Sequence, residues 1–311
     1  MIEHLFDEHG IVLRRDLVAM GIHDQAILRL RRSGCLARVR HGVYADPARW
    51  TAAGPRHRHL MLTHGVLQLY GDDVAASHIS AALVQGAPEW GMPLADVHLT
   101  DLYAAGERRQ ASVHHHQGRC DVHDVTKVGG HWVTTPVRTA LDTAAILPRD
   151  PAVVLLDDFL HRGLVTKEGL SAELTRRQQW SAHLDLLLKV DHASLGSESV
   201  GETRARMLFQ DHGMPAPVLQ LEVHDETGAL IGRVDFAWPA RKVIVEFDGR
   251  QKYHRYRRPG ETLEQAIMRE KRREDRLREQ GWIVVRMTWS DLEHPAPFLA
   301  RLRFRLEHAA A

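Results

Sequence analysis

The chemistry-bearing residues of this chain are two acids that a predicted hairpin would bring together. Residues 233–254 read RVDFAWPARKVIVEFDGRQKYH, with two apolar, β-branched runs on either side of a short Pro-containing segment. This pattern predicts two strands joined by a short loop. If Trp238 pairs with Val243 across that loop, constant register places Asp235 directly opposite Glu246.

Directly opposed residues in a sheet have Cβ atoms about 4.5–5.5 Å apart, so two carboxylates in these positions would repel each other. A hard divalent cation with oxygen ligands is the simplest partner, because paired carboxylates compensate for its partial dehydration and leave positions for water and phosphate. The alternative is a pair of solvated strand acids. The same register predicts Arg233 opposite Asp248, where an ion pair is the alternative to a role beside the metal.

The overall composition is that of a globular protein with two or three domains. The chain has 311 residues, of which 44% are hydrophobic and 26% are charged, and its net charge is +1. No apolar run approaches the roughly 18 residues of a membrane helix, and the start MIEHLFDEHG lacks the features of a signal peptide. We therefore expect a cytoplasmic protein with no membrane partner. Two isolated cysteines, Cys35 and Cys120, predict neither a disulfide framework nor a thiolate metal site.

The first 50 residues alternate short amphipathic helices with tight turns. We predict helices around residues 2–6, 13–20 and 25–32, the last capped by Asp24, then strands at 36–40 and 43–45. This is the order of a winged helix-turn-helix, which points to DNA as the partner. Five arginines without an intervening acid would face phosphate: Arg29, Arg31, Arg32, Arg38 and Arg40. The alternative is a solvated basic helix in a small domain that binds a protein.

The segments GIVLRRDLVAMGI and AILRLRRSGCLARVRHGVYA resemble the N-terminal domain of AbiEi-family antitoxins. The resemblance extends more loosely into the middle of the chain, through VAASHISAALVQG and HWVTTPVRTALDTAA. It implies a winged-helix DNA-binding module, often autoregulatory in that family.

The middle of the chain, residues 55–190, predicts a mixed α/β domain. Helices are expected at 56–70, after Thr135-Pro136, at 151–162 and at 167–177, with strands at 97–100 and 112–115. His114, His115 and His116, with Cys120 and His123 nearby, invite a metal hypothesis. Adjacent histidines on a strand point to alternate faces and no zinc-ligand spacing is visible, so a polar strand near the surface is the favoured interpretation. Asp142 is expected to be a packed helix residue.

The C-terminal region predicts the order α-β-β-β-α-β with an extra helix. A helix at 198–212, capped by Ser197, precedes strands at 217–224, 230–238 and 242–248. A long charged helix at 262–280, a strand at 282–288 and a helix at 296–307 follow. The arginines of the long helix alternate with acids, which is typical of a solvated, self-paired face.

This order, with ESVGETRAR, RVDFAW, VIVEFDGRQKYH and GWIVVRMTW in sequence, resembles the PD-(D/E)XK nuclease superfamily, and within it small nucleases similar to very-short-patch-repair endonucleases. The resemblance implies that Asp235 and Glu246 bind Mg²⁺ or Mn²⁺ with Glu202 nearby, and that the reaction is phosphodiester hydrolysis. Where the superfamily motif has lysine, this chain has Asp248. Lys252 could replace that lysine, and His254 could act as general base or acid.

Two residues flanking Glu202 offer a simpler explanation for it. Glu198 lies one turn earlier and Arg206 one turn later, so an i, i+4 ion pair with Arg206 would account for Glu202 without a metal. Basic and aromatic residues directly after the acids are candidates for phosphate contact and base stacking: Tyr253, Arg255, Arg257 and Arg258.

The sequence therefore predicts an α/β multidomain protein with a winged helix at 1–50, an AbiEi-like middle domain at 55–190 and a PD-(D/E)XK-like domain at 196–311. The main hypothesis is a metal-dependent endonuclease recruited to DNA by the winged helix, with RNA as the alternative substrate. The rival is an AbiEi-like antitoxin and transcriptional regulator whose nuclease-fold domain is inactive, which the Asp248 substitution favours. A cognate partner protein or a second copy of the chain is an open alternative for a further partner.

Overall fold

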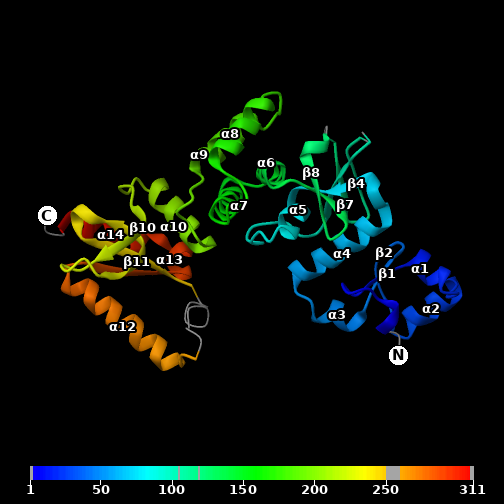
Figure 1. The fold of residues 1–311 in the computed structure, drawn as a ribbon, viewed down its shortest axis with the longest axis horizontal. Helices are drawn as coiled ribbons and strands as arrows, with labels where there is room; N and C mark the ends of the chain where they lie inside the picture. The colour runs from blue at the N-terminus through cyan, green and yellow to red at the C-terminus, as the bar shows by residue number, and fades with distance from the viewer. Residues whose placement is uncertain (1–2, 104–105, 118–119, 250–259, 309–311) are drawn as a thin grey trace. The chain divides into compact units, whose positions relative to one another are not determined.

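The computed structural model describes residues 3–103, 106–117, 120–249 and 260–308, and the chain divides into two compact units, Met1–Asp191 and His192–Ala311 (Figure 1). We call them unit 1 and unit 2. Both are mixed α/β structures, as the sequence predicts. The boundary between them lies beside the predicted start of the C-terminal domain, and the division of residues 1–190 into two further domains stays a prediction. In the described part of the chain, no helix has both the length and the apolar character needed to cross a membrane.

The first 45 residues of unit 1 form a small three-stranded sheet with short helices. The strand order is β1-β3-β2, and Leu17, Ile27 and Leu36 lie in the core beneath it. The elements are η1 (Glu3–Leu5), β1 (Ile11–Leu13), α1 (Arg14–Ala19), α2 (Asp24–Arg32), β2 (Ala37–Arg40) and β3 (Val43–Ala45). The predicted helices and strands are present, whereas β1 was not predicted because three apolar residues resemble the start of the following helix.

The predicted cap of α2 is wrong. His23 occupies the N-cap position and makes no side-chain capping bond. Asp24 is the first residue of the helix and accepts hydrogen bonds of 2.7 and 2.6 Å from Arg14. The Asp24 carboxylate, which the local pattern assigned to capping, therefore forms an ion pair with Arg14 of the neighbouring helix α1.

The rest of unit 1 is built around a six-stranded sheet in the order β6-β7-β5-β4-β9-β8. Its strands are β4 (Val74–Ala76), β5 (Val97–Asp101), β6 (Arg108–Gln110), β7 (Val113–His116), β8 (Val125–Val128) and β9 (His131–Thr134). The helices are α3 (Pro47–Ala52), α4 (Pro55–Tyr70), η2 (Gly71–Asp73), α5 (His78–Val84), η3 (Val122–Asp124), α6 (Pro136–Ile146), α7 (Arg149–His161), α8 (Lys167–Arg176) and α9 (His183–His192).

Two expectations for this region have opposite outcomes. Asp142 is a packed helix residue as predicted, buried and bound to Arg138 at 2.7 Å. The polar strand near the surface is wrong, because β7 lies inside the sheet and both His115 and His116 are buried. Three consecutive histidines look polar in sequence, yet neutral imidazole rings can be buried when ring nitrogens find partners.

Unit 2 is a four-stranded sheet with helices on both faces (Figure 1). The strand order is β10-β11-β12-β13, and β12 and β13 are parallel whereas the other pairs are antiparallel. The strands are β10 (Val218–His224), β11 (Leu230–Trp238), β12 (Val243–Asp248) and β13 (Ile283–Thr288). The helices are α10 (Val200–Asp211), η4 (Pro239–Arg241), α12 (Leu263–Glu279), α13 (Trp289–Glu293) and α14 (Pro295–His308).

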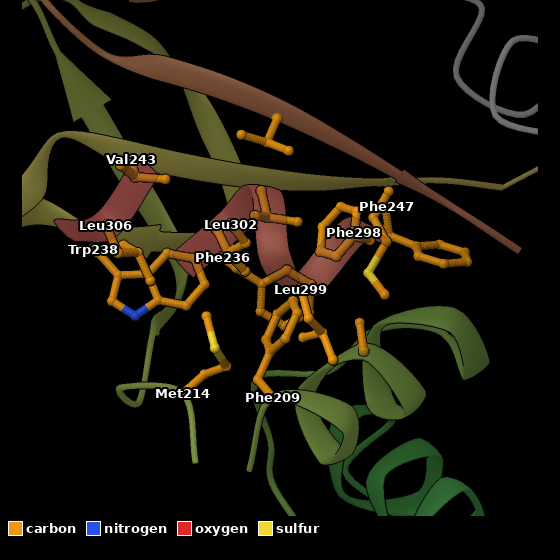
Figure 2. Close-up of a cluster of buried hydrophobic side chains, with 14 of the residues drawn as sticks. Phe209, Met214, Phe236, Trp238, Val243, Phe247, Phe298, Leu299, Leu302 and Leu306 are labelled. Carbon is orange, nitrogen blue, oxygen red and sulfur yellow. The ribbon is translucent and has the colours of Figure 1, made fainter. Parts of the chain in front are cut away.

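Each face of this sheet has its own core. Figure 2 shows Phe236 in one cluster with Phe209 of α10 and with Phe298, Leu299 and Leu302 of α14. Leu277 of α12 packs on the opposite face with Ile244 and Val234. The order of elements is the predicted one with α13 added, and the specific nuclease fold remains a proposal.

The start of α10 differs from the prediction in its cap. Ser199, and not Ser197, is the N-cap residue, and its hydroxyl accepts a hydrogen bond of 3.2 Å from the Glu202 amide. Gly201 follows, where an added Cβ would lie 2.0 Å from the Phe247 ring. Only a glycine allows this close approach, which brings the first turn of α10 against β12.

Candidate functional site

The basic surface of the first 45 residues lies on α2 and β2. Arg29, Arg32 and Arg38 are exposed, and Arg31 is half-buried. Within the described ranges none of these four makes a side-chain ion pair or hydrogen bond. Their guanidinium groups are therefore available to a phosphate backbone.

Arg40 has a different environment from the other four arginines. Its Nε donates to the Ala111 carbonyl at 3.1 Å, and its Nη2 donates to the Tyr70 hydroxyl at 3.2 Å. The guanidinium also lies 5.5 Å from the centre of the Tyr70 ring. Arg40 thus fastens the small sheet to the rest of unit 1, and it is the poorest phosphate contact of the predicted five.

The predicted acids of unit 2 line one pocket of about 240 Å³. We call it the carboxylate pocket. Strands β10 to β13, helices α10 and α12 and the segment just before α10 supply its charged and amide side chains, which are Glu198, Glu202, Gln220, Arg233, Asp235, Glu246, Asp248, Arg269, Glu270, Arg273 and Arg286.

The hairpin register is the predicted one at its loop end. Trp238 pairs with Val243, and the paired stretch continues to Phe236 opposite Val245. Asp235 lies one residue beyond, and its Oδ2 accepts a hydrogen bond of 2.8 Å from the Phe247 amide. The carboxylate of Asp235 is therefore oriented by the backbone of the neighbouring strand.

The predicted pairing of Arg233 with Asp248 is wrong. Arg233 lies opposite Glu222 of β10, and its side chain binds Glu198 at 2.7 Å. Asp248 instead accepts two hydrogen bonds of 3.0 Å from Arg286 on the parallel strand β13. Because Asp248 replaces the motif lysine, this position carries a paired acid and cannot supply an ammonium group.

Two arginines that the sequence reasoning did not assign to the site hold its buried acid. Glu246 is 2% exposed and accepts a hydrogen bond of 2.6 Å from Arg273, while Arg286 lies 3.9 Å from its other oxygen. Arg273 also donates to Glu270 at 3.0 Å. Arg273 was predicted to belong to a solvated helix face, and the position of Arg286 within an apolar strand was the one available signal for a buried partner.

Glu202 is held by neutral donors. It accepts hydrogen bonds from the Ser199 hydroxyl at 2.7 Å, the Glu198 amide at 3.0 Å and the Gln220 amide group at 2.9 Å. Arg206 donates elsewhere, to Ser197 and to the His192 carbonyl, so the i, i+4 pair with Glu202 is not formed. Burial, reinforced by the negative charge of Asp235, raises the pKa of Glu202 to about 7.

The balance of charge in the carboxylate pocket bears on metal binding. Among its described lining residues, six carboxylates face four guanidinium groups, so the acids outnumber the arginines by two. Carboxylate oxygens are the donors that Mg²⁺ and Mn²⁺ prefer. Asp235, Glu202 and Glu246, however, do not bring three ligand atoms within 4.8 Å of one another in the described part of the chain, and Arg273 binds one oxygen of Glu246.

The remaining predicted residues of this site lie outside the described residues. They are Lys252, Tyr253, His254, Arg255, Arg257 and Arg258.

Comparison with known proteins identifies the first part of the chain. Residues 1–45 match the family described as "Transcriptional regulator, AbiEi antitoxin". Two curated relatives from Mycobacterium tuberculosis, the uncharacterized proteins MT2308 (strain CDC 1551 / Oshkosh) and Rv2248 (strain H37Rv), are each 33% identical to this chain over 187 residues. That match covers 59% of this chain and 65% of each relative. The N-terminal 45 residues are thus similar to AbiEi antitoxin regulators, as the sequence motifs predict.

Proposed function

We propose that this protein is a DNA-binding transcriptional regulator of the AbiEi antitoxin type. The observation that carries the proposal is that the family match and the exposed arginines lie in the same segment of the chain. The 45 residues that match the regulator family contain the exposed arginines Arg29, Arg32 and Arg38. A regulator of this kind binds DNA at its own promoter, and in a toxin–antitoxin pair it acts together with a toxin.

The arrangement of elements supports a winged-helix mode of binding. Helix α2 follows α1 after a short turn, and β2 and β3 form a hairpin directly after α2. In such a module the second helix enters the major groove and the hairpin lies along the backbone. Arg29 and Arg32 would then reach the groove and its phosphates, and Arg38 the backbone beside it.

Fluorescence anisotropy with duplex DNA from upstream of the chain's own gene tests this proposal. We expect Arg29→Ala/Arg32→Ala to weaken binding about tenfold or more and to lower the salt slope of log K by about 2, because two phosphate neutralisations are lost. The matched control is Arg241→Ala/Arg305→Ala, which removes two exposed arginines of unit 2. Equal losses in both double variants would show that binding is nonspecific and would contradict the proposal.

A second candidate function is favoured by the excess of carboxylates over guanidinium groups in the carboxylate pocket. We propose that Asp235, Glu246 and Glu202 hold Mg²⁺ or Mn²⁺ and that unit 2 hydrolyses phosphodiesters. Such a cation, when bound, polarises a phosphodiester oxygen and activates water. Arg273 and Arg286 would fix Glu246 and Asp248, while Arg233 and Arg269, the more exposed arginines of the pocket, would contact phosphate.

Calorimetric titration with Mn²⁺ and a DNA cleavage assay separate the two candidates. A metal-dependent nuclease should bind Mn²⁺ and cut DNA, and Asp235→Asn should abolish both with the circular dichroism spectrum unchanged. Glu226→Gln, at an exposed turn acid of the same unit, is the control and should leave both intact. Operator binding without Mn²⁺ uptake or cleavage would leave the regulator with an inactive unit 2.

A further inference from the structure

Three histidines from two strands of the six-stranded sheet bring their ring nitrogens together in unit 1. His98 lies on β5, and His114 and His116 lie on β7. One ligand atom from each residue lies within 4.8 Å of the other two. We call these three residues the histidine cluster. It is separate from the carboxylate pocket and from the arginines of α2.

The sheet register explains how the histidine cluster forms. Strands β5 and β7 are parallel neighbours, and His98 pairs with His114. Residues two apart on a strand share a face, so His116 lies on the same face as His114. His98 Nδ1 and His116 Nε2 are 2.7 Å apart, and one of them donates a hydrogen bond to the other.

His115 shows the contrast with its neighbours. It points to the opposite face of the sheet, where its Nδ1 lies 3.0 Å from Asp101 and 3.2 Å from Arg108. Its ring also meets Tyr70 edge-on. The Nδ1 of His115 is therefore engaged in a polar network of its own, and this residue offers a control on the same strand.

The surroundings of the histidine cluster hold its rings in place. The ring of His78 stacks on His116 with centroids 3.5 Å apart, and His78 has a φ of +47°, a left-handed conformation that is strained for a residue other than glycine. Strain of this kind persists at ligand sites and active sites. Ser80 fixes the strand by accepting a hydrogen bond of 2.8 Å from the His98 amide.

The Glu107 carboxylate lies beside His114, the partly exposed residue of the histidine cluster. His114 Nε2 lies 3.0 Å from Glu107, whose side chain is 60% exposed. Histidines that bind metals commonly donate their other ring N–H to a carboxylate, which sets the tautomer and the ring orientation. Glu107 is placed to do this for His114.

We propose that His98, His114 and His116 form a binding site for a divalent transition-metal ion of the zinc class. Imidazole nitrogens suit Zn²⁺, Ni²⁺ and Cu²⁺, whereas Mg²⁺ and Ca²⁺ need oxygen ligands. Zinc–nitrogen bonds of about 2.0–2.1 Å in tetrahedral geometry place the nitrogens about 3.3 Å apart. His98 Nδ1 and His116 Nε2 are 2.7 Å apart, closer than that value, and one ligand atom from each of the three residues lies within 4.8 Å of the others, so side-chain rotations would complete the site.

Three protein ligands leave one position of a tetrahedral ion open. Because imidazoles supply no negative charge, an anionic fourth ligand such as hydroxide or a small carboxylate is favoured there. The site would then have the geometry of a zinc centre with one open coordination position. DNA binding by a regulator does not require such a centre.

The test uses the full chain with Asp235→Asn/Glu246→Gln, so that the carboxylate pocket does not contribute to metal uptake. After chelator treatment the protein is titrated with Co²⁺, followed by visible absorption, and with Zn²⁺, followed by competition with an indicator. We expect one equivalent of each metal and the intense visible bands of four-coordinate Co²⁺. His98→Gln/His116→Gln in the same background should lose both signals, whereas His115→Gln should keep them.

A second variant guards against a loss of folding in the double mutant. Glu107→Gln changes an exposed side chain and should weaken Zn²⁺ binding about 10–100-fold through the orientation of His114, with an unchanged circular dichroism spectrum. The proposal is overturned if the parent protein binds no Zn²⁺ or Co²⁺, if His98→Gln/His116→Gln binds them equally well, or if His115→Gln loses as much as that double variant.

Discussion

The carboxylate pocket of unit 2 and the histidine cluster of unit 1 place ionisable groups side by side in different ways. In the pocket, charged acids face arginines, and buried Glu246 is bound by Arg273 at 2.6 Å. In the cluster, burial lowers the pKa of His98 and of His116 to about 3, and a nitrogen of each of these rings faces the other at 2.7 Å. A metal would have to compete with a guanidinium in the first site, whereas in the second it would only replace a hydrogen bond between neutral rings.

The two sites also differ in donor atoms, and therefore in the metals that each could bind. Oxygen donors with a net negative charge select hard cations, and neutral nitrogen donors select borderline transition metals. The comparison further implies that acid changes the stability of the two units in opposite directions. It also implies that removing an acid from the pocket destabilises unit 2. The following predictions test those implications in order of decreasing effect.

Removing the acid from the buried ion pair should have the largest effect. We expect Glu246→Ala to lower the free energy of unfolding of unit 2 by about 3 kcal/mol, because Arg273 loses its buried partner and, among the described residues, keeps Glu270 alone as an acidic partner. Urea denaturation measures this change. Asp275→Ala, at an exposed acid of α12, should change it by less than about 0.5 kcal/mol. Similar values for the two variants would mean that arginine does not stabilise the pocket.

Acid should act on the two units with opposite signs in chelator-treated protein. The pKa of His98 and of His116 is lowered to about 3, so below about pH 6.5 the unfolded state binds more protons and unit 1 loses stability, on the order of 2 kcal/mol for each ring between pH 7 and 5. The pKa of Glu202 is raised from 4.5 to about 7, so the folded state binds more protons in that window and this group makes unit 2 more stable as pH falls.

Hydrogen exchange, corrected for the intrinsic effect of pH, resolves these changes at β7 and at α10. His98→Gln/His116→Gln should flatten the pH dependence at β7, and Glu202→Gln should flatten that at α10. If the same slope appeared at β7 in the parent and in the double variant, the neutral state of the cluster would not be the cause.

The smallest effect is expected from the packing that positions Glu202. Gly201→Ala should cost about 1–2 kcal/mol, because the new Cβ collides with Phe247 and the gain in helix propensity offsets only part of the strain. It should also weaken Mn²⁺ binding in the carboxylate pocket while leaving the histidine cluster unaffected. Thermal unfolding and the two metal titrations measure both results, and Gly201→Ala/Phe247→Leu should recover part of the lost stability. An unchanged melting temperature in Gly201→Ala would show that α10 does not depend on this contact.

Much of unit 2 could be predicted because its local signals agree with its tertiary structure. Strand β11 has its predicted bounds, and Trp238 pairs with Val243 as the hairpin pattern indicates. Helix α12 also begins within one residue of its predicted start at residue 262, with Thr262 as its N-cap. Alternating apolar residues, turn residues and caps act over a few positions, so the sequence displays them directly.

Other features could not be read from local patterns. The short strands β4, β8 and β9 have three or four residues each, too few for periodicity to separate them from loops. The cap assigned to Asp24 failed because its carboxylate pairs with Arg14 of α1. The cap assigned to Ser197 failed because α10 begins two residues later, where Ser199 accepts the capping bond from the Glu202 amide.

The sequence by itself determined the chemical groups of this protein: five arginines near the start, three consecutive histidines, and the acids Asp235 and Glu246 on two strands of a hairpin. The tertiary structure decided what those groups meet. It placed Arg273 and Arg286 beside the acids, and it brought His98 to His114 and His116 through a parallel pairing of β5 and β7. Side-chain partners across a sheet depend on strand order, which is set by long-range packing and not by the residues on either side.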